Sequence, residues 1–285
     1  MTNIVAGIVL YNPDIDRLEQ NIKAAKLQVG EVVLFDNGSR NIKDVIHMLH
    51  INNLKCILLE EEQNMGIAYA LNKIASWSIE NKYDWLLTLD QDTVISSCLV
   101  KEYCKYLKLP RVGQLCCNFI DRNTGREEYN DFKSNSYSEI DKWITSGSLI
   151  NLAALKKIGG FDEKLFIDYV DFDVCFALRK YDFKNYIINF VGMLHEIGDR
   201  KEYKIGLKSI DVMNHNAIRH FYISRNEIIV YKRYPDETLP NMYVLQIKTM
   251  IKVILFESNK REKIKAIFKG TISGLSNYFI RDCYL

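Results

Sequence analysis

The chain has 285 residues, of which 48% are hydrophobic and 26% are charged, with only four prolines. This composition excludes a minidomain and a low-complexity or disordered chain, and it is typical of one large α/β domain with a small appendage. The net charge of +2 is uneven, because residues 246–285 hold eight Lys/Arg against three acids and leave the rest of the chain at −3. The basic end indicates an anionic surface as partner or a solvated helix face, whereas the body shows no pattern of nucleic-acid binding.

Short β-rich runs alternate with helical patterns through the first hundred residues. This alternation predicts βαβ units and a mainly parallel, doubly wound sheet flanked by helices. The expected strands are Asn3–Tyr11, Glu31–Asn37, Lys55–Glu61 and Asp84–Asp90, and the expected helices are Asp14–Leu27, Lys43–His50 and Gly66–Glu80.

The alternation loosens after Val100. We expect a strand that ends at His195, then mostly helix from about His215 through the basic segment Val244–Lys269. The chain is therefore divided into a main domain over residues 1–210 and a helical, basic extension over residues 211–285. The other elements expected between these points are strands Gly113–Asp121 and Trp143–Asn151 and helices Leu152–Ile158 and Val170–Lys180.

Nothing in the sequence predicts a membrane span or a secreted protein. The apolar run near the N-terminus lacks a preceding basic segment and is expected to be a strand, and no apolar run approaches the roughly 18 residues that a spanning helix needs. The seven cysteines show no C-x-x-C or Cys/His ligand spacing, so they are interpreted as reduced thiols of a cytoplasmic protein.

Polar clusters follow four of the expected parallel strands. Ligands of such sheets bind at the carboxyl ends of the strands, where the strand order reverses, so the four clusters are expected to share one crevice. The clusters are Tyr11-Asn12, FDNGS at 35–39, EEEQNMG at 60–66 and LDQD at 89–92.

Asp90 and Asp92 stand one residue apart at the end of an apolar strand. Two carboxylates that point the same way repel each other unless a cation lies between them. Mg²⁺ and Mn²⁺ prefer such oxygen ligands and bridge them to substrate phosphates. The alternative is a pair of aspartates that cap a turn, but the other polar strand ends favour a metal site.

Asp36 precedes an Asn-Gly-Ser turn, and Asn64 and Asn72 flank the start of the next helix. Turn formation alone explains Asp36, yet together the three side chains are suited to line a pocket for a nucleotide base and its phosphates. The sequence lacks a glycine-rich phosphate loop, which counts against ATPases and dinucleotide enzymes.

Residues 159–183 contain Asp162, Asp168, Asp171 and Asp173. The last two fall in the first turn of a predicted helix, where the macrodipole favours acids, and this explains one or two of the four. An aspartate close to a sugar hydroxyl would instead serve as a general base. His195 is either a satisfied buried histidine or, beside a metal, a third ligand or phosphate contact.

At this point the chain resembles the inverting glycosyltransferases of family 2, and within them the bacterial rhamnosyltransferase-like group. The resemblance spans about residues 3–230 and implies a GT-A fold, which is Rossmann-like with a mainly parallel central sheet flanked by helices. The motifs that carry it are GIVLYNPDIDRLEQNI, VVLFDNGSRN, NMGIAYALN, WLLTLDQDT, TSGSLINLAALKKIGGFDEKLFIDYVDFD and LHEIGD.

The resemblance implies roles for these residues. Asp90 and Asp92 would hold Mg²⁺ or Mn²⁺ on the donor diphosphate with His195 in support, and Asp171 would be the base. The family's usual Glu-Asp pair is Val170-Asp171 here, so the choice between Asp171 and Asp168 stays open. The implied donor site comprises Tyr11, Asn12, Asp36, Asn64, Gly66, Asn72, Asp90 and Gln91, and the implied acceptor site Ser146, Gly147, Gly160, Phe161 and Asp162.

The implied activity is a metal-assisted single displacement that inverts the anomeric centre. The leading expectation is transfer of L-rhamnose from dTDP-β-L-rhamnose to a hydroxyl of a lipid-linked cell-surface polysaccharide precursor. The alternatives are a UDP-hexose donor in the same fold and a non-catalytic carbohydrate-binding relative. A pyrophosphorylase-type nucleotidyltransferase would need a glycine-rich, lysine-containing loop after the first strand, where LYNPDIDRL stands.

The segment YVLQIKTMIKVILF, residues 243–256, places its apolar residues on one broad helical face with Lys248 and Lys252 at the margin. This pattern predicts peripheral contact with the cytoplasmic leaflet of the membrane. A core helix or a homodimer helix fits the same spacing.

Overall fold

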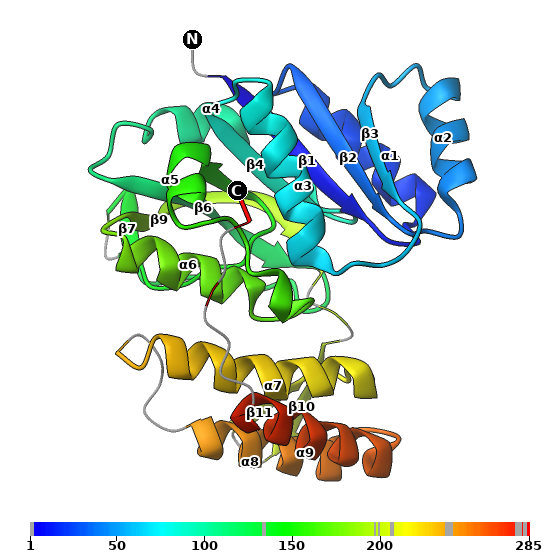
Figure 1. Cartoon of the computed structure of the whole chain (residues 1–285), viewed down its shortest axis with the longest axis vertical. Helices are drawn as coiled ribbons and strands as arrows, with labels where there is room; N and C mark the ends of the chain where they lie inside the picture. Colours follow the sequence, from blue (N-terminus) through cyan, green and yellow to red (C-terminus); the bar gives the residue numbers. More distant parts are fainter. Residues whose placement is uncertain are drawn as a thin grey trace.

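The computed structural model describes residues 3–132, 135–196, 198, 200–205, 208–236, 242–276, 281 and 284–285. The α/β fold predicted from the sequence is confirmed (Figure 1). A nine-stranded sheet has the order β3-β2-β1-β4-β8-β6-β9-β5, with β7 also paired to β9. Its strands are β1 (Ile4–Leu10), β2 (Glu31–Asn37), β3 (Ile57–Glu61), β4 (Trp85–Asp90), β5 (Val94–Ile95), β6 (Val112–Asp121), β7 (Tyr137–Ile140), β8 (Ser148–Asn151) and β9 (Lys184–His195).

The parallel character of the sheet holds for its first half. Strands β3, β2, β1 and β4 pair in parallel, as the βαβ pattern predicts. The second half is mixed, because β8 runs antiparallel to both β4 and β6, while β6 and β9 are parallel.

Helices cover both faces of the sheet. Alternate residues of β1 point to opposite faces, so Ile8 packs in one core cluster and Val5 in the other. Helices α1, α2 and α4 bury their apolar sides in the first cluster, and α3, α5 and α6 in the second. Their bounds are α1 (Ile15–Lys26), α2 (Ile42–Ile51), α3 (Ile67–Glu80), α4 (Leu99–Cys104), α5 (Leu152–Lys157), the 3₁₀ turn η1 (Glu163–Leu165) and α6 (Val170–Lys180).

Three further helices follow the sheet: α7 (Ala217–Arg233), α8 (Met242–Phe256) and α9 (Lys260–Ser276). Figure 1 shows α7 between the sheet domain and the other two helices. The C-terminal part of α7 packs against the second core cluster through Ile229 and Val230. The backbone of α9 approaches α7 so closely that a Cβ on Gly270 would lie 2.2 Å from the Phe221 carbonyl oxygen.

Most expected elements form within a few residues of their predicted bounds, although β5, α4 and β7 were not expected and three further differences stand out. The strand predicted at Trp143–Asn151 is limited to β8, because Gly147 adopts a φ of +74° and residues 144–146 line the pocket described below. The sequence reading missed the hairpin β10 (Lys201–Ile205) and β11 (Lys208–Val212), and the predicted boundary after residue 210 falls inside β11. The basic segment forms two helices, separated near Asn259, which has a φ of +51°.

Two further features of the described residues concern the cysteines and the length of the apolar helices. Six cysteines there are free thiols, and Cys283 lies outside that part. A search of the same residues finds no helix with the length and apolarity to cross a bilayer.

Candidate active site

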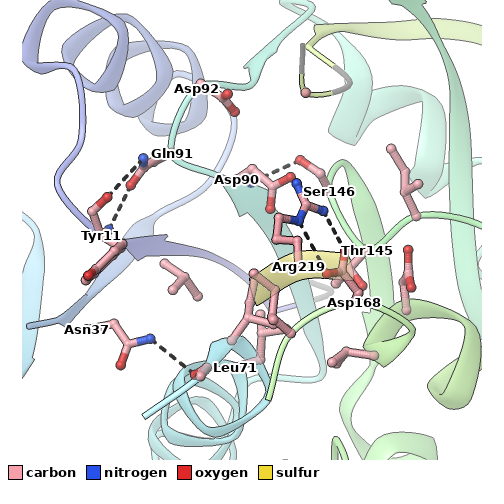
Figure 2. A pocket seen from close by; sticks show the side chains of 18 of the residues that line it. Tyr11, Asn37, Leu71, Asp90, Gln91, Asp92, Thr145, Ser146, Asp168 and Arg219 are labelled. Atoms are coloured by element: carbon pink, nitrogen blue, oxygen red, sulfur yellow. Dashed lines mark hydrogen bonds and ion pairs between the residues drawn. The ribbon is translucent and has the colours of Figure 1, made fainter. Parts of the chain in front are cut away.

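The candidate site lies where the strand order reverses. The chain leaves β1 for β2 on one side and returns to β4 on the other, so the carboxyl ends of β1 and β4 flank the switch point of the sheet. Gln91 joins the two ends: its side chain accepts a hydrogen bond from the Tyr11 N–H at 2.8 Å and donates one to the Tyr11 carbonyl at 3.3 Å (Figure 2). A pocket of about 540 Å³ opens there.

Asp90, Asp92 and His195 converge in this pocket. Each offers one ligand atom, and these atoms all lie within 4.8 Å of one another, as a metal centre requires. His195 reaches the site because the end of β9 pairs with β5, which follows β4 closely in the chain. The two carboxylates at the end of β4 and the imidazole at the end of β9 thus come from segments more than 100 residues apart in the chain, and they form a donor set suited to Mg²⁺ or Mn²⁺.

A chain of hydroxyl groups fixes the orientation of these ligands. The Thr93 hydroxyl lies 3.0 Å from Nδ1 of His195 and 2.8 Å from the Ser146 hydroxyl, which in turn accepts the backbone N–H of Asp90 at 3.0 Å. The other ring nitrogen, Nε2 of His195, faces the Asp90 carboxylate at 3.9 Å. Thr93 thereby leaves Nε2 turned toward the acids, which is the arrangement that supports a ligating histidine.

The electrostatics of the cluster also suit a cation. Desolvation in the pocket raises the pKa of Asp90; His195 opposes this rise, and the neighbouring carboxylate of Asp92 adds to it. A cation between the two acids would stabilise the charged form of Asp90 against both desolvation and the repulsion by Asp92.

Asp168 and Asp171 lie in the same pocket but in different surroundings. The Asp168 carboxylate is held by the guanidinium of Arg219, with Nη2 of Arg219 at 2.5 Å from Oδ1, and Figure 2 shows this pair beside Asp90. No cation pairs with Asp171 among the described residues. Burial raises the pKa of Asp171 to about 7, and the negative charges of Asp168 and Asp90 add to the rise, while the Phe172 N–H opposes it.

The loop that presents these two aspartates is held in an unusual conformation. Phe166, Asp168 and Tyr169 all have φ values between 62° and 66°, in the left-handed region that non-glycine residues rarely adopt. The amide of Asn226 on α7 donates to three carbonyls of this loop, at 2.8 to 2.9 Å. Helix α7 therefore supplies both the restraint on the loop and the ion pair to Asp168.

The close approach of this loop also explains why a glycine precedes α3. Gly66 has a φ of +91°, and a Cβ there would lie 2.7 Å from the Phe166 carbonyl oxygen, which accepts the N–H of Ile67. The close approach brings α3 and the aspartate loop together at one side of the pocket.

The predicted site residues divide into two groups. Those that line the pocket are Tyr11, Asn64, Gly66, Asp90, Gln91, Asp92, Ser146, Asp168, Asp171 and His195. Those outside the lining are Asn12, Asp36, Asn72, Gly147, Gly160, Phe161 and Asp162.

Several residues of the second group make structural contacts instead. Asp36 is 3% exposed and accepts the Ser39 N–H, while Asn72 binds the backbone of Phe161 in both directions. Asp162 is paired with Arg233. The roles that the family resemblance implied for these residues therefore remain predictions.

The sequence reading missed the residues that α7 and its approach bring to the pocket, chiefly Arg219 and His215. Burial, with a further contribution from Arg219, lowers the pKa of His215 to about 4. No sequence motif identifies these two residues. The sequence does contain a helix N-cap beside them, because the Asn216 side chain accepts the Arg219 N–H at the start of α7. The pocket lining also includes Thr145, Glu196 and Met213, to which the sequence analysis assigned no role.

A comparison with known protein families matches residues 6–187 to the family described as Glycosyl transferase family 2. The match covers more than half of the chain. The chain belongs to glycosyl transferase family 2. As a member of that family it is a glycosyltransferase enzyme, and the prediction made from the sequence motifs is confirmed.

Among curated proteins the enzyme is similar to dTDP-rhamnosyl transferase RfbF of Shigella flexneri, with 27% identity over 290 residues that cover 96% of each chain. The similarity supports the rhamnosyltransferase-like group named from the sequence. It extends through α7, α8 and α9 as well as the sheet domain.

Solved glycosyltransferases share the fold. Mannosyltransferase PcManGT from Pyrobaculum calidifontis, solved with GDP-Man and Mn²⁺, has a TM-score of 0.59 at 14% identity, with 96% of this chain and 75% of that chain covered. S. aureus TarS 1–349, solved with UDP-GlcNAc, has a TM-score of 0.60 at 12% identity, with 97% and 89% covered. Both likenesses support the predicted GT-A architecture.

Proposed function

We propose that this family 2 glycosyltransferase moves L-rhamnose from dTDP-β-L-rhamnose to a hydroxyl group of a saccharide acceptor, with inversion at the anomeric carbon. The donor is supported by the similarity to dTDP-rhamnosyl transferase RfbF along 96% of both chains. One observation carries the chemistry: a single pocket combines the cluster Asp90, Asp92 and His195 with Asp171, a carboxylate of raised pKa that lacks an ion-pair partner among the described residues.

The metal ligands in this proposal are Asp90, Asp92 and His195. Their mutual distances and their oxygen and nitrogen donors fit Mg²⁺ or Mn²⁺. A bound dication would neutralise charge that develops on the departing diphosphate.

Asp171 is the proposed general base. Its carboxylate takes the proton of the acceptor hydroxyl, the acceptor oxygen forms a bond to C1 of rhamnose, and the bond from C1 to the diphosphate oxygen breaks. Attack from the face opposite the diphosphate converts the β-linked donor to an α-L-rhamnoside. Asp168 is the weaker candidate, because its carboxylate is already engaged in an ion pair with Arg219.

Arg219 is the proposed protein cation for the diphosphate. Among the described residues that line the pocket, Arg219 is the one with a Lys or Arg side chain, whereas five residues there carry carboxylates. It also lies close enough to Asp90 to lower the pKa of that group. A donor diphosphate that enters beside Asp90 would therefore meet the guanidinium.

The acceptor is proposed to be a lipid-linked saccharide presented at the cytoplasmic leaflet. Support comes from the basic C-terminal helices, which leave apolar side chains exposed as described in the next subsection.

The test is a panel of dTDP-β-L-rhamnose, UDP-glucose, UDP-GlcNAc and GDP-mannose, titrated calorimetrically into the protein with Mn²⁺, with Mg²⁺ and with EDTA. We expect tight binding of the dTDP donor alone, loss of binding in EDTA, and loss in Asp92→Asn. Preference for a UDP-hexose would replace the donor assignment by the alternative in the same fold. Donor binding that is unchanged by EDTA and by Asp92→Asn would refute the metal site.

A further inference from the structure

Helix α8 carries apolar side chains on its outward side. Ile247, Ile251, Ile254 and Leu255 are 49–59% exposed, and their spacing of three, four and seven residues places them on one helical face. Single exposed apolar residues are ordinary on a protein surface, but a stripe along more than two turns of one helix is not.

The inward side of α8 is in part polar. Gln246 is buried and donates from its amide to the Ser224 carbonyl oxygen at 3.3 Å and to the Glu227 carboxylate, both on α7. Among the side chains of this helix that the structure describes, Val253 is the fully buried apolar one. Packing within the protein therefore does not account for the long apolar residues on the other side.

Helix α9 repeats the pattern. Phe268, Ile272 and Leu275 are 43–64% exposed at a spacing of four and seven residues. The side that packs on α7 is built from Gly270 and Gly274, whose missing Cβ atoms permit close contact with the α7 backbone. Ile267 is the large apolar residue that α9 buries among its described residues, so α9, like α8, leaves most of its large apolar side chains at least partly exposed.

The charge of this region is strongly positive. Between residues 244 and 276 six cationic side chains are exposed against one exposed acid, Glu262, because Glu257 is buried with Lys263 and His220. The exposed cations are Lys248, Lys252, Lys260, Arg261, Lys265 and Lys269.

We propose that the outer faces of α8 and α9 dock the enzyme on an anionic lipid bilayer. Exposed apolar side chains enter the boundary between headgroups and acyl chains, and the lysines beside them contact lipid phosphates. A second copy of the chain is the less favourable occupant, since a symmetric interface would bring two positive faces together. The apolar stripe and the excess of cations thus point to the same partner.

The docking faces are connected to the active site by the hairpin β10–β11. Tyr203 of β10 packs on Phe256 of α8 with ring centroids 4.8 Å apart, and Lys252 donates to the Asp211 carbonyl of β11 at 3.0 Å. The hairpin follows His195 in the chain and precedes His215, and both of these line the pocket. Docking would therefore hold the pocket close to the membrane surface, where a lipid-linked acceptor lies.

The experiment is co-flotation of the full chain with two kinds of vesicle, phosphatidylcholine alone and phosphatidylcholine with phosphatidylglycerol. Two double variants remove apolar side chains, Ile251→Gln/Ile254→Gln on α8 and Phe268→Gln/Ile272→Gln on α9. Their matched control is Leu27→Gln/Ile51→Gln, exposed apolar residues of the sheet domain. A charge variant, Lys248→Gln/Lys265→Gln, is matched with Lys43→Gln/Lys101→Gln, which are exposed lysines of the sheet domain.

We expect the wild type to float with the anionic vesicles and to be released by high salt. Each apolar variant should lower the partition coefficient about tenfold or more, and the charge variant about fivefold for each lysine removed. The two controls should bind like the wild type, and all variants should keep the wild-type melting temperature, since every substituted side chain is exposed.

Three results would overturn the proposal. The first is a wild type that stays with neither vesicle, and the second is an equal effect of the controls and the test variants. The third is a wild type that is dimeric by light scattering and becomes monomeric in the apolar variants, which would assign the faces to a second copy. Vesicle binding is measured without donor or acceptor, so this inference and the proposed transfer reaction fail separately.

Discussion

Asp171 combines burial, two neighbouring acids and no ion-pair partner among the described residues, and these features decide its chemistry. Its carboxylate keeps a proton up to about pH 7 because burial, then Asp168 and Asp90, disfavour the charged form. A group with a pKa near the working pH both accepts and releases a proton readily, which suits a general base. The Asp168 carboxylate, three residues earlier, is instead engaged in an ion pair with Arg219.

The first prediction concerns the activity of Asp171→Asn. Asparagine keeps the shape of the side chain but accepts no proton, so kcat should fall by about 100-fold to 10,000-fold. In the wild type, log kcat/KM should decline with falling pH below an inflection at or below about pH 7, since only the deprotonated base is active and a bound dication lowers its pKa further. Rate profiles in saturating metal measure this. A larger loss in Asp168→Asn than in Asp171→Asn would reverse the assignment.

The second prediction is that the same substitution stabilises the fold at alkaline pH. The pKa of Asp171 is raised in the folded protein, so the native state binds this proton more tightly than the unfolded chain, and the carboxylate destabilises the fold increasingly as pH rises from about 4 to about 7. Asp171→Asn should therefore raise the melting temperature more at pH 8 than at pH 4. Asp44→Asn, an exposed residue of α2, is the control and should show no such pH dependence. An equal change at both pH values would contradict the raised pKa.

At the scale of elements, α7 holds the loop that presents both aspartates. The buried amide of Asn226 donates to the carbonyls of Leu165, Ile167 and Asp168, and the Arg225 guanidinium donates to the carbonyls of Lys164 and Leu165. These bonds offset the cost of the left-handed conformations in the loop. Helix α7 therefore restrains the loop at the proposed site and also connects the sheet domain to α8 and α9.

The third prediction follows from this restraint. Asn226→Ala removes the amide donor of the Ile167 and Asp168 carbonyls and one of the two donors of the Leu165 carbonyl, which should lower the free energy of unfolding by about 2 kcal/mol. The loop should also lose its fixed geometry, so kcat should fall about tenfold or more while the KM for the donor changes little. The control is Asn81→Ala, which removes an exposed hydrogen bond from the Asn81 side-chain amide to the Trp77 carbonyl. Reduced stability with unchanged kcat would show that α7 stabilises the fold without positioning the base.

The elements differ in how far the sequence predicts them, for physical reasons. The ends of β1 and β4 were predictable because apolar runs mark buried parallel strands, and parallel strands place their carboxyl ends at one edge. The contacts of Arg219 and Asn226 were not predictable. Each residue hydrogen-bonds to a loop more than 50 residues away, and helical periodicity does not specify where on the sheet domain a helix packs. The strand predicted through Trp143 was too long, because local apolar content does not reveal the positive φ of Gly147.

At the scale of the molecule, the end of the chain returns to the sheet domain (Figure 1). Nε of Arg281 lies 2.9 Å from the Asp173 carboxylate, and the same guanidinium donates to the carbonyls of Ile158 and Gly160. The Tyr284 N–H donates to the Gly159 carbonyl at 2.8 Å. Asp173, a residue first considered as a helix-cap acid, thus anchors the C-terminal segment.

This anchor leads to the last prediction. Asp173 is fully buried and is paired with Arg233 and Arg281, so a change that removes one partner leaves a buried charge incompletely compensated. Arg281→Gln should lower the free energy of unfolding by about 3 kcal/mol, the lower end of the loss for a broken buried pair, because Arg233 remains. Urea denaturation measures it, with Lys105→Gln as control, since the exposed pair of Lys105 with Glu102 should contribute less than about 1 kcal/mol. Equal effects of the two substitutions would mean that the C-terminal segment does not bind the sheet domain in solution. The C-terminal helices would then be connected to the active site only through the packing of α7 on the sheet domain.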